Sequence, residues 1–254
     1  MSGRLSRRAA LTVPLSLLSV SARALAFGDG GAFHPRLLRA GNHPPLGVRS
    51  TGAGRWSWEL VRRTSAPARL VASEVAADQP ALQAEPFVIW AGDADPGPLS
   101  AAEVRGLTRF MRLGGVLVVD DSNPASGAFG RGARRELARV LPESAPVRLD
   151  PGHVIFKTFY IVDRPVGRVL GPPDVSAIVR GKSAQVIFLE HDLLGALARS
   201  GEGFALETEP GGLEQREHAV RLAVNIAMYV LCSDYKDDQV HAPFLMRRRA
   251  RQKP

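Results

Sequence analysis

The sequence contains very little cysteine and, after its first 26 residues, no long apolar run. Cys232 is its only cysteine, so no disulfide can form within the chain. The longest charge-free apolar stretch beyond residue 26, residues 222–232, has 11 residues, whereas a transmembrane helix needs about 20. The sequence therefore predicts neither a disulfide-stabilised domain nor a membrane-spanning helix in this part of the chain.

The first 26 residues contain the three regions of an export signal. In chain order these are a positive region, an uncharged apolar stretch and a small-x-small cleavage pattern, formed by Arg4, Arg7 and Arg8, by residues 9–22, and by residues 24–26. The Ser-Arg-Arg-Ala-Ala-Leu run at residues 6–11 is similar to the twin-arginine consensus. We therefore predict a twin-arginine signal peptide, and a mature chain that is periplasmic and either soluble or peripheral.

Removal of this segment changes the charge of the chain. The formal net charge is +8 and falls to +4 without residues 1–26. Five positive residues lie within the tail 247–253, which leaves residues 27–246 almost neutral. Nucleic-acid-binding domains concentrate positive charge on a face or helix, so we expect no nucleic-acid partner. The basic tail, residues 242–254, is a candidate for contact with anionic lipid or an acidic partner, with a solvated tail as the alternative.

The middle of the chain alternates predicted strands and helices. After a strand at residues 33–40 and a helix at 56–63, the pattern predicts strands at 86–91, 116–119 and 147–149, and helices at 100–111 and 133–141. Ser100 and Glu103 form a capping box. Residues 116–119 are all apolar, which is typical of a strand covered on both faces. The order predicts an α/β fold, flavodoxin-like, with a mostly parallel sheet and helices on both faces.

The second half of the mature chain predicts further strands and one long helix. The strands are expected at residues 154–161, 175–179 and 184–189, some of them in a β-rich insertion, and the helix at 214–231. Asn225 lies within this apolar helix and needs a hydrogen-bond partner if it is buried. We expect a single α/β domain over residues 27–241, between the signal peptide and the basic tail.

Several stretches together resemble domain of unknown function family 4159, over roughly residues 33–241. They are residues 114–121, 150–160, 190–196, 225–229 and 235–241. The closing Tyr-Lys-Asp-Asp-Gln-Val-His run is the most specific. The resemblance implies a fold similar to class I glutamine amidotransferases but no established activity. Members of this family often accompany von Willebrand factor A-type proteins and a MoxR-type ATPase, which implies a partner among envelope proteins.

The sequence argues strongly against glutamine hydrolysis by a cysteine thiolate. An amidotransferase needs a cysteine at a tight turn between a strand and a helix. The corresponding segment reads Asp-Asp-Ser-Asn at residues 120–123, and Cys232 lies at the end of the last predicted helix, where a free cysteine is usually a small buried hydrophobe.

Polar residues at predicted strand ends are the remaining candidates for chemistry: Asp120, Asp121, Ser122, His153, His191 and Asp192. A serine hydrolase would pair Ser122 with His153 or His191, but no Gly-x-Ser-x-Gly elbow is present. The alternative role of Ser122 is a turn at the end of its strand.

A divalent metal site is a further hypothesis for the same residues. Suitable ligand atoms are present on Asp120, Asp121 and His153, and also on His191 and Asp192. No His-x-x-x-His or Cys-x-x-Cys spacing supports the site. Alternatively, Asp and His at these positions cap helices, with His191 and Asp192 as an N-cap for a helix that begins at Leu193.

Two other segments have weaker signals. The Gly-Ala-Phe-Gly-Arg-Gly run at residues 127–132, with Arg134 and Arg135, is suited to an anion at a helix start, or forms a mobile loop. Asp237, Asp238 and His241 are suited to a cation, or to packing and subunit docking. No cofactor motif is present.

Taken together, the residues favour a non-catalytic or cryptic ligand-binding or interaction module in an envelope complex. The alternative is a periplasmic hydrolase, metal-assisted or not, that uses the cluster Asp120, Asp121, His153 and His191.

Overall fold

The computed structural model describes residues 31–42, 44–181 and 183–250, and side chains as far as Ser233. The predicted signal peptide lies outside the described residues, as do the last four residues of the basic tail and the side chains of Asp237, Asp238 and His241.

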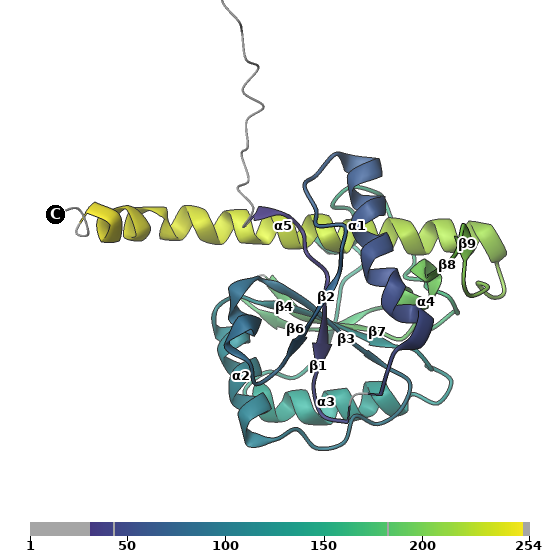
Figure 1. The fold of residues 1–254 in the computed structure, drawn as a ribbon, viewed down its shortest axis with the longest axis horizontal. Coiled ribbons are helices and arrows are strands. Elements are labelled where there is room, and N and C mark those ends of the chain that lie inside the picture. Colours follow the sequence, from purple (N-terminus) through teal and green to yellow (C-terminus); the bar gives the residue numbers. More distant parts are fainter. Residues whose placement is uncertain (1–30, 43, 182, 251–254) are drawn as a thin grey trace, which may run out of the picture.

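A seven-stranded sheet forms the centre of the molecule (Figure 1), in the order β2-β1-β3-β4-β7-β6-β5. Its strands are β1 (Arg36–Arg39), β2 (Ser73–Ala76), β3 (Phe87–Gly92), β4 (Val116–Asp121), β5 (Val147–Arg148), β6 (Ser176–Arg180) and β7 (Ser183–Leu189). The first five strands of the sheet order are parallel, β6 pairs antiparallel with β7, and β5 pairs antiparallel with β6. Numbered along the chain, the parallel strands follow the 2-1-3-4-5 order of flavodoxin-like folds. The predicted α/β class is confirmed.

Helices cover both faces of the sheet, as predicted. They are α1 (Thr51–Thr64), α2 (Ala101–Arg112), α3 (Ala128–Val140), α4 (Leu193–Leu197) and α5 (Gly212–Ala250). Figure 1 shows α1, α4 and α5 on one face and α2 and α3 on the other. Strand β4 explains the arrangement, since Val116 and Val118 belong to the hydrophobic cluster under α1, α4 and α5, whereas Leu117 and Val119 belong to the cluster under α2 and α3. Alternate side chains of one strand thus fill two cores.

Local contacts fix the ends and positions of the helices. At the start of α2, Ser100 Oγ accepts from the Glu103 backbone N–H at 3.2 Å, and Glu103 Oε2 accepts from the Ser100 N–H at 2.7 Å, which confirms the predicted capping box. On the opposite face, Trp56 of α1 is fully buried and donates its indole N–H to the Ala223 carbonyl of α5 at 2.7 Å. Helices α1 and α5 are therefore held together by apolar packing and by a directional bond.

The prediction of a strand at residues 154–161 is wrong. A short 3-10 helix, η4 (Val154–Phe156), begins there and turns follow it. The backbone N–H groups of Phe159 and Tyr160 both donate to Asn225 Oδ1, at 3.1 and 2.8 Å, and the Asn225 amide donates to the Tyr160 carbonyl at 2.8 Å. These backbone groups are satisfied by a side chain rather than by a neighbouring strand. The same bonds confirm that Asn225 has a structural partner.

Other predictions need smaller corrections. The strand at 147–149 exists as β5 but pairs antiparallel with β6, so it does not continue the parallel series. The loop expected at residues 127–132 is the first part of α3, which begins at Ala128. Strand β2 was not predicted, because only Val75 among its four residues is buried.

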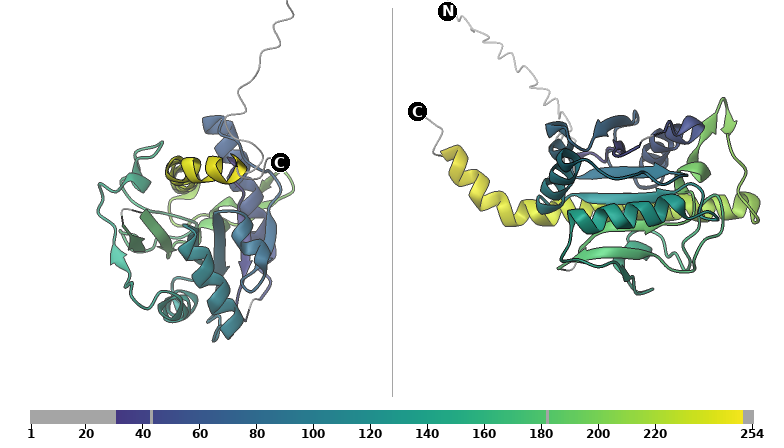
Figure 2. Two further views of the ribbon diagram at one scale, coloured as in Figure 1. Left: turned by 90° about the vertical axis from the view of Figure 1, so that its left-hand side faces the viewer. Right: turned by 90° about the horizontal axis from the view of Figure 1, so that it is seen from below.

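The second half of the domain is β-rich, as expected. The β6–β7 hairpin extends the sheet, and β8 (Arg199–Ser200) and β9 (Gly203–Phe204) form a separate two-stranded antiparallel sheet. Helix α5 is much longer than predicted and continues past the body of the domain (Figure 2). Cys232 is therefore within the helix and exposed, not buried at its end. No helix among the described residues is long and apolar enough to cross a membrane.

Candidate functional site

The carboxyl edge of the parallel sheet gathers most of the polar residues that the sequence indicated. Asp120 and Asp121 end β4, and His191 and Asp192 follow the neighbouring strand β7. All four are buried. Open α/β sheets usually bind ligands at this edge, so the partners of each side chain decide what the edge can do.

Asp120 is a helix cap. Its two carboxylate oxygens accept the backbone N–H groups of Leu193 and Leu194, both at 2.8 Å. These are the first two N–H groups of α4, which have no partner within the helix. Complete burial, with the nearby carboxylate of Asp192, raises the pKa of Asp120 to about 7, against the opposing effect of the two N–H donors.

Asp192 is the centre of a buried ion-pair cluster. Its Oδ1 accepts the Gly195 N–H at 3.1 Å, which confirms the predicted N-cap of the helix that begins at Leu193. Arg49 donates through Nε and Nη2 to the two oxygens, both at 2.9 Å, and Arg168 donates to Oδ2. The carboxylate is fully buried, so the two guanidinium groups compensate its charge.

The carboxylate of Asp121, like that of Asp120, accepts backbone N–H groups. Its oxygens accept the N–H groups of Asn123 at 2.9 Å and Gly130 at 3.0 Å, and burial raises the pKa of its carboxyl group. A Cβ at position 130 would lie 3.0 Å from Asp121 Oδ2, which explains a glycine inside α3. The backbone that was a candidate anion cradle therefore already binds a carboxylate of the chain itself.

The two arginines of that candidate cradle also have acidic partners. Arg134 pairs with Glu190 at 2.5 Å, and Arg135 pairs with Asp95 at 2.8 Å. Each guanidinium therefore has an acidic partner, although Arg134 Nη1 has no hydrogen-bond partner among the described residues.

His191 uses both ring nitrogens within the fold. Nδ1 accepts the Glu190 N–H at 3.1 Å, and Nε2 lies 2.9 Å from the Pro172 carbonyl oxygen. This pattern assigns a neutral ring with its proton on Nε2. Burial lowers the pKa of His191 and so favours that neutral form.

The structure does not bring Ser122 and His153 together. Ser122 is buried, and its hydroxyl has no hydrogen-bond partner among the described residues. His153 lies beside Tyr229, with ring centres 6.1 Å apart. The Tyr229 hydroxyl accepts the N–H of Ala184, near the start of β7, at 2.7 Å. His153 is thus near the amino edge of the sheet, and Ser122 at the carboxyl edge.

The crevice between β1 and β3, where the strand order reverses, is also filled. The Asn42 N–H donates to the Pro96 carbonyl at 2.6 Å. A Cβ on Gly41 would lie 2.3 Å from the same oxygen. The loops that follow β1 and β3 therefore pack directly against each other at the position where flavodoxin-like folds bind ligands.

The predicted metal ligands do not converge either. Within the described part of the chain, no three His, Cys, Asp or Glu side chains form a group suited to a metal ion. Asp120 and Asp121 adjoin in sequence but accept N–H groups from different segments, residues 193–194 and residues 123 and 130.

Sequence reasoning missed Arg49 and Arg168, which give the edge its ion pairs. Arg49 lies in a 3-10 turn, η2 (Gly47–Ser50), and Arg168 in an irregular segment. Neither position has a periodic pattern or a motif, so only the fold reveals that both arginines bind Asp192.

Comparison with known proteins gives a family. No match was found among the curated proteins. Residues 48–231 match the family model of a domain of unknown function, DUF4159. Since the match covers well over half of the chain, the protein belongs to the DUF4159 family.

Proposed function

We propose that this protein is a non-catalytic ligand-binding or interaction module of the bacterial envelope. One observation carries the proposal: the oxygens of Asp120 and Asp192, two fully buried carboxylates of the carboxyl edge, are occupied by backbone N–H groups and arginines of the chain itself. A general acid or base must reach the proton that it transfers. Carboxylates held in this way stabilise a fold rather than a transition state.

The missing nucleophile supports the same proposal. Cys232, the single cysteine of the chain, lies in α5 next to Ser233, which is at the amino edge of the sheet, so no thiolate faces the strand–helix turn at the carboxyl edge. Ser122 does lie at that turn, but the nearest predicted base, His191, has both nitrogens engaged. Nucleophilic catalysis needs a nucleophile within hydrogen-bond reach of a base.

Export and a place in the envelope are supported by the sequence. The twin-arginine pattern precedes an apolar stretch too short to span a bilayer, and a chain with one cysteine does not depend on disulfide formation after export. A module that folds in the cytoplasm and then joins other envelope proteins fits both features.

The catalytic alternative is tested with the purified chain and two variants. The full chain and the Ser122→Ala and His153→Ala variants are assayed against chromogenic amides, esters and phosphoesters, with and without added divalent cations. We expect no turnover above the rate of a heat-denatured sample. Turnover that falls at least a hundredfold in Ser122→Ala would overturn the proposal and establish a hydrolase.

Export is tested separately. Arg7→Lys with Arg8→Lys should leave the unprocessed chain in the cytoplasm, whereas Arg4→Lys, which preserves the pair, should be exported and processed. Fractionation and immunoblotting distinguish the two. Equal export of both variants would contradict the twin-arginine route without bearing on the binding role.

A further inference from the structure

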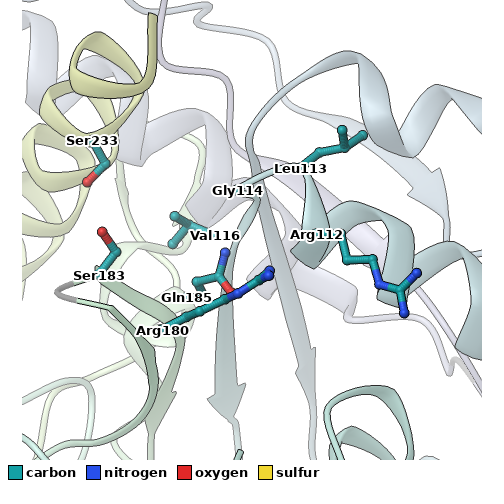
Figure 3. A pocket seen from close by; sticks show the side chains of 8 residues that line it. All are labelled: Arg112, Leu113, Gly114, Val116, Arg180, Ser183, Gln185 and Ser233. Carbon is teal, nitrogen blue, oxygen red and sulfur yellow. The ribbon is translucent and has the colours of Figure 1, made fainter. Parts of the chain in front are cut away.

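A polar cavity of about 280 Å³ lies at the amino edge of the sheet, the end opposite Asp120. Its wall combines the end of α2, the start of β4, the β6–β7 hairpin and α5 (Figure 3). The residues that matter for binding are Arg112, Arg180, Ser183, Gln185 and Ser233. The cavity is outside every group that the sequence indicated.

Among the described residues, the cavity wall contains two arginines and no acidic side chain. Arg112 and Arg180 are both exposed, and neither forms an ion pair with an acidic residue in the part of the chain that is described. Figure 3 shows the Arg180 side chain extending toward Gln185, whereas the Arg112 guanidinium is turned outward at the rim. Arg180 is therefore the main cation, and rotation of Arg112 would add a second.

Gln185 supplies an independent sign of a ligand. The residue is 6% exposed, and its amide N–H donates to the Met111 carbonyl at 2.9 Å, which fixes the orientation of the amide. Its Oε1 has no hydrogen-bond partner in the described structure. Buried polar atoms are almost always paired, so this oxygen is an unpaired, covered acceptor on a residue that lines the cavity.

We infer that this cavity binds a small oxyanion that has a hydrogen-bond donor beside its charge. The inference rests on the proposed binding role and names its ligand class. The guanidinium groups of Arg180 and Arg112 match the planar geometry of carboxylate or phosphate oxygens. Since Oε1 is covered in this structure, its pairing with the donor, an amide N–H or a hydroxyl, requires the side chains around it to shift when the anion binds. The volume is at the small end of ligand sites, which suits a small metabolite rather than a dinucleotide.

The ligand class is tested by calorimetric titration of the full chain at constant ionic strength. N-acetylglycine offers a carboxylate with an N–H, inorganic phosphate offers an oxyanion with an O–H, and acetate offers a carboxylate without a donor. We expect saturable binding of N-acetylglycine or phosphate, with acetate at least tenfold weaker. The tighter of the first two identifies the anion as carboxylate or phosphate. No saturable binding, or equal binding of all three, would overturn the inference.

Matched variants locate the site. Arg180→Gln should weaken binding at least tenfold, and Arg105→Gln, which removes the same charge from an exposed position of α2 outside the cavity, less than twofold. Gln185→Met should remove the preference over acetate. If Gln185→Met does not fold, the two arginine variants and the comparison with acetate still test the inference. Equal losses of affinity in Arg180→Gln and Arg105→Gln would refute the site. Absence of binding here leaves the proposed function intact, whereas turnover in the hydrolase assay overturns that function and not this site.

Discussion

The two edges of the central sheet use their charged residues in opposite ways. At the carboxyl edge, Asp120 and Asp192 are buried and every carboxylate oxygen accepts a bond from the chain itself. At the amino edge, Arg180 is exposed without an acidic partner among the described residues, and Gln185 Oε1 is buried without a donor. The carboxylate oxygens of Asp120 and Asp192 are thus all engaged, although the Ser122 hydroxyl at the same edge has no partner among the described residues, whereas the amino edge combines an unpaired cation with an unpaired acceptor.

The difference shows that polar residues at strand ends are not sufficient evidence of chemistry. Helix α4 begins directly after β7, so its first N–H groups are buried and need acceptors. Asp120 and Asp192 supply them, and Arg49 and Arg168 then balance the buried charge of Asp192. Acidic residues at strand ends, a pattern typical of an active site, here cap the amino terminus of a helix.

The largest expected effect concerns the ion-pair cluster. Asp192→Ala removes the partner of Arg49 and Arg168 and the cap of Gly195, and loss of one member of a buried ion pair costs about 3–5 kcal/mol of unfolding free energy. Urea unfolding measures it, with Asp163→Ala as the control, since Asp163 is exposed and should change stability by less than about 0.5 kcal/mol. A cost below about 1 kcal/mol for Asp192→Ala would mean that the edge does not depend on this cluster.

The next effect is a pH dependence at the same edge. The pKa of Asp120 in the folded protein is raised to about 7, above its ordinary value, so the folded state binds the proton more strongly than the unfolded state. Stability then falls as pH rises from about 4 to about 7, by at most about 1.4 kcal/mol per pH unit. Asp120→Asn removes this contribution, so the stability difference between wild type and variant should shrink between pH 5 and pH 8.

Unfolding midpoints in urea at the two pH values test this. Subtraction of the variant from the wild type cancels the other titrating groups, His153 and His191 among them. A difference that stays constant between pH 5 and pH 8 would contradict the raised pKa of Asp120.

These effects also show where sequence information was sufficient. The apolar run of β4 predicted a strand covered on both faces, and Ser100 with Glu103 predicted the start of α2, because both signals depend only on neighbouring residues. The proximity of Asp120, His191 and Asp192 followed from the rule that parallel strands end at one edge. Their partners did not follow, because Arg49 and Asp192 are 143 positions apart.

The errors have a common physical origin. Residues 154–161 have strand-like composition, but Asn225, far along the chain, provides the acceptor for their backbone N–H groups. The glycines of α3 resembled a loop, yet Gly130 is required by close contact with Asp121. The cavity at the amino edge had no sequence signal, because its polar residues come from three separate segments: the end of α2, the β6–β7 hairpin and α5. Long-range contacts, not local preference, decided all three.

A comparison of arginines sharpens the contrast between the edges. Arg49→Gln breaks two bonds to a buried carboxylate and should cost about 2 kcal/mol. Arg180→Gln removes a side chain without an acidic partner in the described structure and should change stability by less than about 0.5 kcal/mol. Urea unfolding of both variants measures the difference. Equal costs would show that Arg180 has a structural role and is not held available for a ligand.

The smallest effect is expected at Gln185. Gln185→Met removes a bond to the Met111 carbonyl, which costs about 1 kcal/mol, but it also removes the unpaired Oε1, whose burial has a cost of similar size. The two contributions oppose each other, so the net change should stay within about 0.5 kcal/mol. The matched control is Gln83→Met, because Gln83 also donates one bond to a backbone carbonyl, that of Gly106 at 3.2 Å, from a half-buried position. No orphaned oxygen is removed there, so its cost should be near the full 1 kcal/mol. If Gln185→Met instead costs clearly more than Gln83→Met, then Oε1 is already paired in solution, and the acceptor that the amino edge offers to a ligand is not vacant.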